Sequence, residues 1–396
     1  MSTVFLICSL VGTTVAQDSL LSKSDIIKLD FNSLADKRNK VRSKDPALMP
    51  AYEQLLKDAD KLLTFAPVSV MQKTEFPPSG NKHDYMSIAP YFWPDPTKPN
   101  GLPYINRDGE VNPEVRKYTD KNNMPVLCNN IYTLSLAYYF SNDEKYARHA
   151  AKLAEVWFLD SATKMNPNLN YGQAVKGVTE GRAAGLIDSR FIIWAMDGIR
   201  LLHTSPYWTP RDQLSIQHWL ADFLTWLQTS KIGQDELHAT NNHGVWYDAQ
   251  SLAIAIFIDS TDLAGKIVSR AAARLDKQMD TAGFFPLELT RTTSLHYSVF
   301  ILNAFYVIAQ LSEETHMNLW TWESPSGKSL KKSFQVILPF IAKEKTWPGP
   351  QIHEFGYADA VPLLLEGHSK FDCHPCMDII KNIEGEKYDR SLVHLL

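Results

Sequence analysis

Three polar clusters in this 396-residue chain contain side chains suited to moving protons next to a negative charge. Asn241-Asn242-His243-Gly244 precedes an apolar segment, Arg291 lies just before His296-Tyr297, and Arg182 follows Glu180-Gly181. Imidazole and phenol groups act as acids and bases, while amide and guanidinium groups stabilise developing charge. The chain has no nucleophile elbow, phosphate loop or HExxH motif. These clusters therefore indicate acid–base chemistry on an anionic ligand, held near helix starts whose free N–H groups favour a carboxylate.

Apolar residues recur every three or four positions along most of the chain, a period typical of α-helices. Short turns such as Ser141-Asn142-Asp143 and Asp259-Ser260-Thr261 separate several of these segments, and strand-like alternation is scarce. We expect an all-α protein of stacked antiparallel helix hairpins, forming a single domain over residues 17–396. The expected helices are Tyr52–Phe65, Leu127–Phe140, Tyr146–Phe158, Ile187–Leu202, Gln213–Leu227, Ala249–Ile258, Leu263–Met279, Tyr297–Leu311, Leu330–Ile341 and Ala358–Leu365.

The segment Phe76–Pro125 interrupts this pattern, because it is rich in Pro, Gly, Asn and Asp and shows no period. A structureless segment of that length in a compact fold is usually functional. Its aromatic residues, including Tyr85, Tyr91 and Trp93, either line a groove for sugars or anchor the loop to the helices. The residues alone leave both interpretations open.

Composition and charge narrow the range of partners and compartments. Forty Lys and Arg residues against 44 Asp and Glu residues give a net charge of −4, so nucleic acid is not an expected partner. The apolar run Val4–Val15, ending in the small-residue site Thr14-Val15-Ala16, predicts a signal peptide over residues 1–16. We expect a secreted or periplasmic bacterial protein, monomeric and without a membrane span.

Three cysteines follow the expected signal peptide, an odd number that cannot form a complete disulfide framework. Cys373-His374-Pro375-Cys376 has the spacing of a redox dithiol, but no βαβ pattern surrounds it and no second pair is present to complete a zinc site. A local disulfide or two inert thiols is therefore expected here.

Five stretches carry a family resemblance: Tyr85–Pro96, Gly101–Tyr104, Arg107–Gly109, Gly181–Asp188 and Asn241–Asp248. They resemble the alginate lyase superfamily of polysaccharide lyases over roughly residues 50–365, and the long aromatic loop is closer to family thirty-eight than to family five. The resemblance implies an (α/α) toroid of six to seven helix hairpins, with the loop over a cleft. Gly244 stands where family five has Ser, and Arg291 precedes Tyr297 by six positions instead of seven.

The resemblance further implies that the protein cleaves a 4-linked polyuronate by β-elimination, without a metal or cofactor. Asn242, Arg291 and Arg182 would neutralise the uronate carboxylate while its C5 proton is removed. In mannuronate this proton and the leaving O4 lie on one face, so Tyr297 can be both base and acid; in guluronate they lie on opposite faces, so His243 would be the base. Contacts to the acidic polysaccharide are expected from Tyr85, Tyr91, Trp93, Arg182, Asn241, His296, His353 and Tyr357.

Three other functions remain open from the sequence. A lyase for another uronan, such as glucuronan, would use the same catalytic groups. A glycoside hydrolase on an (α/α) toroid would need two opposed carboxyl groups, and a polysaccharide-binding protein would need only the aromatic residues. The carboxylates available to a hydrolase are Asp84, Glu180, Asp188, Glu288 and Glu354. A polyuronate also requires a locally positive groove, for which Arg291, Arg182, Lys82 and Arg107 are the candidates.

Overall fold

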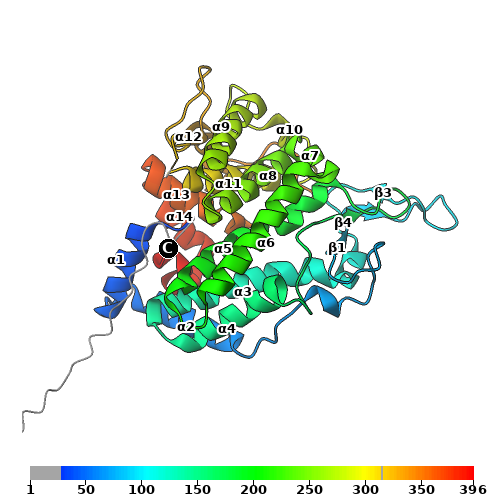
Figure 1. Ribbon diagram of the computed structural model, residues 1–396. Coiled ribbons are helices and arrows are strands. Elements are labelled where there is room, and N and C mark those ends of the chain that lie inside the picture. Colours follow the sequence, from blue (N-terminus) through cyan, green and yellow to red (C-terminus); the bar gives the residue numbers. More distant parts are fainter. Residues whose placement is uncertain (1–27, 314) are drawn as a thin grey trace, which may run out of the picture.

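The computed structural model describes residues 28–313 and 315–396 and is mainly helical (Figure 1). The signal peptide expected over residues 1–16 lies outside the described residues. The helices are α1 (Phe31–Arg42), α2 (Met49–Leu62), α3 (Thr119–Ser141), α4 (Glu144–Ala154), α5 (Ile192–Leu201), α6 (Pro210–Thr229), α7 (Lys231–Leu237), α8 (Asn242–Phe257), α9 (Thr261–Gln278), α10 (Pro286–Leu289), α11 (Ser294–Ser312), α12 (Leu330–Ile341), α13 (Val361–Phe371) and α14 (Cys376–Glu384).

An inner set of helices packs in sequence order, with α3, α5, α8, α11 and α13 each contacting the next. An outer set covers it: α2 and α4 lie against α3, α6 against α8, α9 against α8 and α11, and α12 against α11 and α13. An outer helix needs only one apolar stripe, which faces the inner helices. Helix α9 therefore buries side chains at intervals of three or four residues. These side chains are Ala264, Ile267, Val268, Ala271, Ala272 and Leu275. The predicted all-α toroid is thus confirmed, and the expected number of six to seven helix hairpins stays a prediction.

Helix α11 is an inner helix that is packed on every side except one. Only four of its 19 residues are not buried, His296, Phe300, Asn303 and Gln310, and their spacing places them on a single face. The helix is long and apolar enough to cross a membrane, yet 78% of its most apolar window is buried inside the protein. Its hydropathy is that of a core helix with one narrow polar stripe.

The segment predicted to be a loop folds into short strands, in part. Strand β1 (Met86–Ile88) pairs in parallel with β4 (Tyr171–Ala174), and β2 (Phe92–Trp93) pairs antiparallel with β3 (Ile105–Asn106). These strands lie at one end of the helical body, and α1 lies at the opposite end (Figure 1). The loop is also shorter than predicted, because α3 begins at Thr119 and continues through Pro125.

A buried ion pair fixes this segment to the start of α3. The Lys73 ammonium lies 2.7 Å from Asp120 Oδ2 and also donates to the carbonyl oxygens of Lys82 and Asp84, at 2.7 and 2.6 Å. Both charged side chains are almost completely excluded from solvent. Burial raises the pKa of Asp120 to about 6, although Lys73 opposes this shift.

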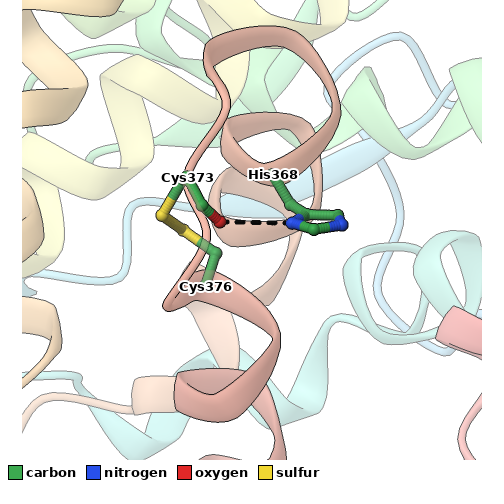
Figure 2. Close-up of a disulfide and its surroundings, with 3 residues drawn as sticks. All are labelled: His368, Cys373 and Cys376. Carbon is green, nitrogen blue, oxygen red and sulfur yellow. Dashed lines mark hydrogen bonds between the residues drawn. A yellow bond between two sulfur atoms is a disulfide. The ribbon is translucent and has the colours of Figure 1, made fainter.

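A disulfide joins Cys373 and Cys376 in the connection from α13 to α14, as Figure 2 shows. The ring of His368 forms a hydrogen bond through Nδ1 with the Cys373 carbonyl oxygen at 3.2 Å. Of the two alternatives that the sequence left open, the local disulfide is the one present, and Cys128 is a buried free thiol.

Candidate active site

A cavity of about 1850 Å³ runs along the inner helices. At the end near the strands it is lined by residues that include Tyr91, His243 and Tyr297. It continues along the exposed face of α11 as far as Gln310, and residues of α1 and the last residues of the chain, such as Leu396, line it at the other end. The first turns of α8 and α11 both open into the strand end of this cavity, so the polar clusters that precede these helices meet there.

Tyr297 occupies the first turn of α11 and forms a hydrogen bond between its hydroxyl and that of Tyr91, at 3.0 Å. The Arg291 guanidinium lies over the Tyr297 ring, with Cζ 3.6 Å from the ring centroid. Burial raises the pKa of the Tyr297 phenol well above its usual range and Tyr91 adds to this, while the positive charge of Arg291 opposes it. The phenol is therefore protonated at neutral pH in the unliganded protein and is suited to donate a proton.

Arg291 itself is held by a carboxylate of the strand segment. Its Nε lies 3.1 Å from both carboxylate oxygens of Asp108, its second donor group is also bonded to Asp108, and the Thr292 amide donates to the same carboxylate at 3.0 Å. Although burial raises the pKa of Asp108, these donors hold it below its ordinary value. Arg291 thus contacts both the Tyr297 ring and Asp108, so part of its hydrogen-bonding capacity is already taken up by a carboxylate of the protein.

His243 forms a pair with a buried carboxylate that directs its ring. Asn241 caps α8 by accepting a hydrogen bond from the His243 amide at 3.2 Å, which places His243 in the first turn. His243 Nδ1 lies 2.7 Å from Glu236 Oε1, and Glu236 is only 2% exposed. When Nδ1 carries a proton for this carboxylate, the other ring nitrogen, Nε2, is left with a lone pair that can accept a proton.

Asn242 is anchored by a second buried carboxylate. Its backbone N–H donates to Glu288 Oε1 at 2.7 Å, and its side-chain amide donates to Oε1 and Oε2 at 3.1 and 2.9 Å. Burial raises the pKa of Glu288, an effect that the Asn242 donors oppose. Asn242 Oδ1 has no hydrogen-bond partner among the described residues, so this carboxamide is fixed on one side and unsatisfied on the other.

The positive side chains of the cavity differ in whether a carboxylate neutralises them. Lys121 lies 3.2 Å from Asp188, which also accepts hydrogen bonds from Tyr85, Ser87 and Gln173. Arg182 donates to Gln173 Oε1 at 2.9 Å and lies over the Phe92 ring, but forms no ion pair with a carboxylate of the described chain. Arg182 is therefore available to an anionic ligand.

Comparison with known proteins agrees with this geometry. The family model described as alginate lyase matches residues 69–347. A crystal structure of an alginate lyase from Bacteroides ovatus is 36% identical, with a TM-score of 0.88, over 95% of this chain and 100% of that one. The chain belongs to the alginate lyase family.

More distant members share the fold. Alginate lyase A1-III, in a histidine-to-alanine variant complexed with a tetrasaccharide, is 14% identical with a TM-score of 0.59, over 91% of each chain. The same enzyme from Sphingomonas species A1 is 15% identical with a TM-score of 0.52, over 84% of this chain and 91% of that one. Among curated proteins, none matches this member of the alginate lyase family.

The cavity of this alginate lyase family member brings together eight of the twelve site residues predicted from the sequence: Tyr91, Arg182, Asn241, Asn242, His243, Arg291, His296 and Tyr297. His296 also lies 3.5 Å from Asp359, another cavity residue. Whether these eight bind substrate or catalyse its cleavage stays a prediction.

The other four predicted residues do not line the cavity. Tyr85 is completely buried and donates to Asp188 at 3.1 Å, so the prediction that it contacts substrate is wrong. Trp93 donates to the Glu110 carbonyl, His353 Nε2 lies 3.1 Å from the Gly109 carbonyl oxygen, and Tyr357 packs on Phe355. For Trp93, this contact matches the anchoring alternative that the sequence left open for the aromatic residues of Phe76–Pro125.

Two carboxylates that contact predicted site residues could not be recognised as their partners from the sequence. Glu236 lies seven residues before His243 in a different helix, and no sequence pattern marks it as the partner of that ring. Glu288 was considered only as a hydrolase acid, whereas its carboxylate is occupied by Asn242. Among the described residues, no group of three or more His, Cys, Asp or Glu side chains is arranged to hold a metal ion.

Proposed function

We propose that this protein cleaves alginate by β-elimination, with Tyr297 and His243 transferring the protons. The observation that carries the proposal is the His243–Glu236 pair, at 2.7 Å, in the same cavity as the buried phenol of Tyr297. One group is poised to accept a proton and the other to donate one, as elimination across the C4–C5 bond requires. Asn242 and Arg182 neutralise the uronate carboxylate as charge develops on it.

The two epimers of alginate would use these groups differently. For guluronate, His243 removes the C5 proton and Tyr297 donates a proton to the departing O4 from the other side. For mannuronate, Tyr297 performs both steps, and Arg291 favours the ionised phenol that this route needs. In either case the C5–H bond and the C4–O4 bond break, and a C4–C5 double bond forms.

A glycoside hydrolase is disfavoured by the state of the available carboxylates. Asp188 accepts four hydrogen bonds, Glu288 is occupied by Asn242, and Asp84 is bonded to Ser79 and Asn166. Glu180 and Glu354 are exposed and lie outside the lining of the cavity. A pair of free opposed carboxyl groups, which hydrolysis requires, is not found among these five candidates.

Digestion of polymannuronate, polyguluronate and glucuronan tests the proposal. We expect products with the ultraviolet absorbance of a conjugated double bond from alginate blocks, because only elimination creates it. His243→Asn should suppress guluronate cleavage more strongly than mannuronate cleavage. Reducing ends without this absorbance would support a hydrolase, tight binding without products a binding protein, and turnover of glucuronan alone a different uronan lyase.

We also propose that the protein is a monomer exported to the periplasm or the medium. The Cys373–Cys376 disulfide supports an oxidising compartment. Sedimentation of the purified protein and fractionation of the cells that produce it would test the two parts separately.

A further inference from the structure

Arg190 is a cavity residue to which the proposed chemistry gives no task. It lies in the 3₁₀ segment Ala183–Phe191, and its side chain is partly exposed to the cavity. Its Cζ lies 4.0 Å from the ring centroid of Phe191, 5.4 Å from that of Phe300 and 6.0 Å from that of Trp246. The guanidinium is thus held in an aromatic setting at a fixed position.

No carboxylate of the described chain forms an ion pair with this guanidinium. Within residues 28–313 and 315–396, its one hydrogen bond runs from Nη1 to the Ile187 carbonyl oxygen at 2.8 Å and uses one of five N–H donors. Other cations of the cavity, such as Lys121 with Asp188 and Lys370 with Glu313, have partners. Burial lowers the pKa of Arg190 to about 10, although the negative charge of Asp188 opposes this shift.

The position of Arg190 relative to the proposed acid and base follows from helix geometry. Trp246 lies three residues after His243 on α8, and Phe300 lies three residues after Tyr297 on α11. Three residues advance a helix by about 4.5 Å. Arg190, which contacts both aromatic rings, therefore lies about one helical turn further into the cavity than the proton-transfer groups.

We propose that Arg190 and Phe300 form a subsite for the uronate residue next to the linkage that is cleaved. The guanidinium binds the carboxylate of that sugar through its free N–H donors, and the cavity-facing ring of Phe300 contacts the pyranose. Trp246 and Phe191 hold the guanidinium in place. This inference rests on the proposed function, because it takes a polyuronate as the ligand.

Arg190→Gln tests the subsite, with Arg148→Gln as a matched control. Arg148 also lies over an aromatic ring, that of Tyr207 at 5.7 Å, but it is exposed and outside the cavity. We expect Arg190→Gln to raise KM by about 10- to 100-fold on long oligouronates, because a charge-assisted hydrogen bond is lost, with a much smaller effect on kcat. The increase should shrink on the shortest substrate that is cleaved.

Arg190→Lys provides a second variant that keeps the charge but not the planar fork. We expect a KM between those of wild type and Arg190→Gln. An unchanged KM at every substrate length, or an equal loss at every length, would overturn the subsite. Thermal unfolding of each variant identifies a loss that comes from misfolding, in which case Arg190→Lys carries the test.

The two proposals fail in different ways. Absence of unsaturated products from the wild-type protein would contradict the proposed function. Unsaturated products from wild type, together with an Arg190→Gln variant that behaves like Arg148→Gln, would contradict the subsite alone. Calorimetric titration of wild type and Arg190→Gln with an oligomannuronate measures the same contact without turnover, and equal affinities would overturn it.

Discussion

Tyr297 combines a protonated phenol with contact to a cation, so it is the residue on which the chemistry depends most. Tyr297→Phe keeps the ring under Arg291 and removes only the hydroxyl that bonds to Tyr91. We expect turnover to fall by at least about 10² with the fold intact, since proton transfer typically contributes that much. Turnover near that of wild type would assign the proton transfer to another group, and His296, whose ring contacts Tyr297, would be the first to test.

The raised pKa of Tyr297 gives the mannuronate reaction a pH dependence of defined sign. Only the ionised phenol can remove a proton, and its fraction rises about tenfold per pH unit below the pKa. Turnover of polymannuronate should therefore increase with pH through the neutral and mildly alkaline range. Arg291→Gln should lower this activity at each pH, because the guanidinium favours the ionised form. A wild-type profile that is flat from neutral pH upward would show that Tyr297 is not the base.

Residue types in the site were predictable, whereas their partners were not. His243 and Tyr297 stand at helix starts beside amide and guanidinium groups, and this pattern is visible along the chain. Glu236 contacts His243 from the neighbouring helix α7, and Asp108 contacts Arg291, which lies over the Tyr297 ring, from 183 positions away. Contacts of this kind depend on tertiary packing, for which spacing in a single sequence contains no signal.

At the scale of elements, the buried pair of Lys73 and Asp120 connects the strand segment to α3. Lys73→Met should destabilise the protein at neutral pH by about 3–5 kcal/mol, because it leaves a buried carboxylate without a partner. The pKa of Asp120 is already raised in the folded wild-type protein, and it would rise further without Lys73. The folded variant therefore favours the protonated carboxyl group of Asp120. The destabilisation should therefore be smaller at pH 5, where less work is needed to protonate the group, and grow as the pH increases.

Chemical denaturation at the two pH values measures this difference. Lys145→Met is the control, since Lys145 pairs with Asp60 at the surface, and little change is expected. An equal loss of stability at both pH values would indicate that Lys73 contributes packing of its alkyl chain and not its charge.

Helices in which apolar residues recur every three or four positions over many residues were predicted well, because burial of one helix face produces this spacing directly. All ten expected segments overlap helices, and Leu330–Ile341 has the same bounds in the structure. The helices α1, α7, α10 and α14 were not predicted because they are short or polar, so tertiary contacts stabilise them more than their own pattern does. Pro125 is expected to mark a helix boundary, but it lies inside α3, beyond the first four residues whose N–H groups have no partner within the helix.

At the scale of the molecule, a protein of net charge −4 must bind an anionic polymer through local charge. Two of the four cations predicted to do so, Arg182 and Arg291, line the cavity, whereas Lys82 and Arg107 lie over Phe76 and Trp93 outside it. Of the four cations expected in a positive groove, only these two arginines therefore lie where the polymer would bind.

Ionic strength should then affect binding more than catalysis. We expect KM for polymer to rise as salt increases from about 0.1 to 0.5 M, with kcat changing less, because Tyr297 is buried and shielded from mobile ions. Arg182→Gln should weaken this salt dependence, and Lys82→Gln should leave it as in wild type. A KM that does not respond to salt would contradict electrostatic binding in the cavity.

The end of the cavity opposite the strands has a consequence for how the chain folds. There Ser33 donates to the carbonyl oxygen of Leu396 at 3.5 Å, across 363 positions, and the Lys28 amide donates to Asp197 at 2.9 Å. Each inner helix contacts a neighbour that is near in sequence, so most of the ring can form early. Closing the ring costs more conformational entropy, because it joins segments that are far apart in the chain. We therefore expect closure to be the late step in refolding and the first to reverse. Amide hydrogen exchange should accordingly open α1 and residues 392–396 at a lower free energy than α8.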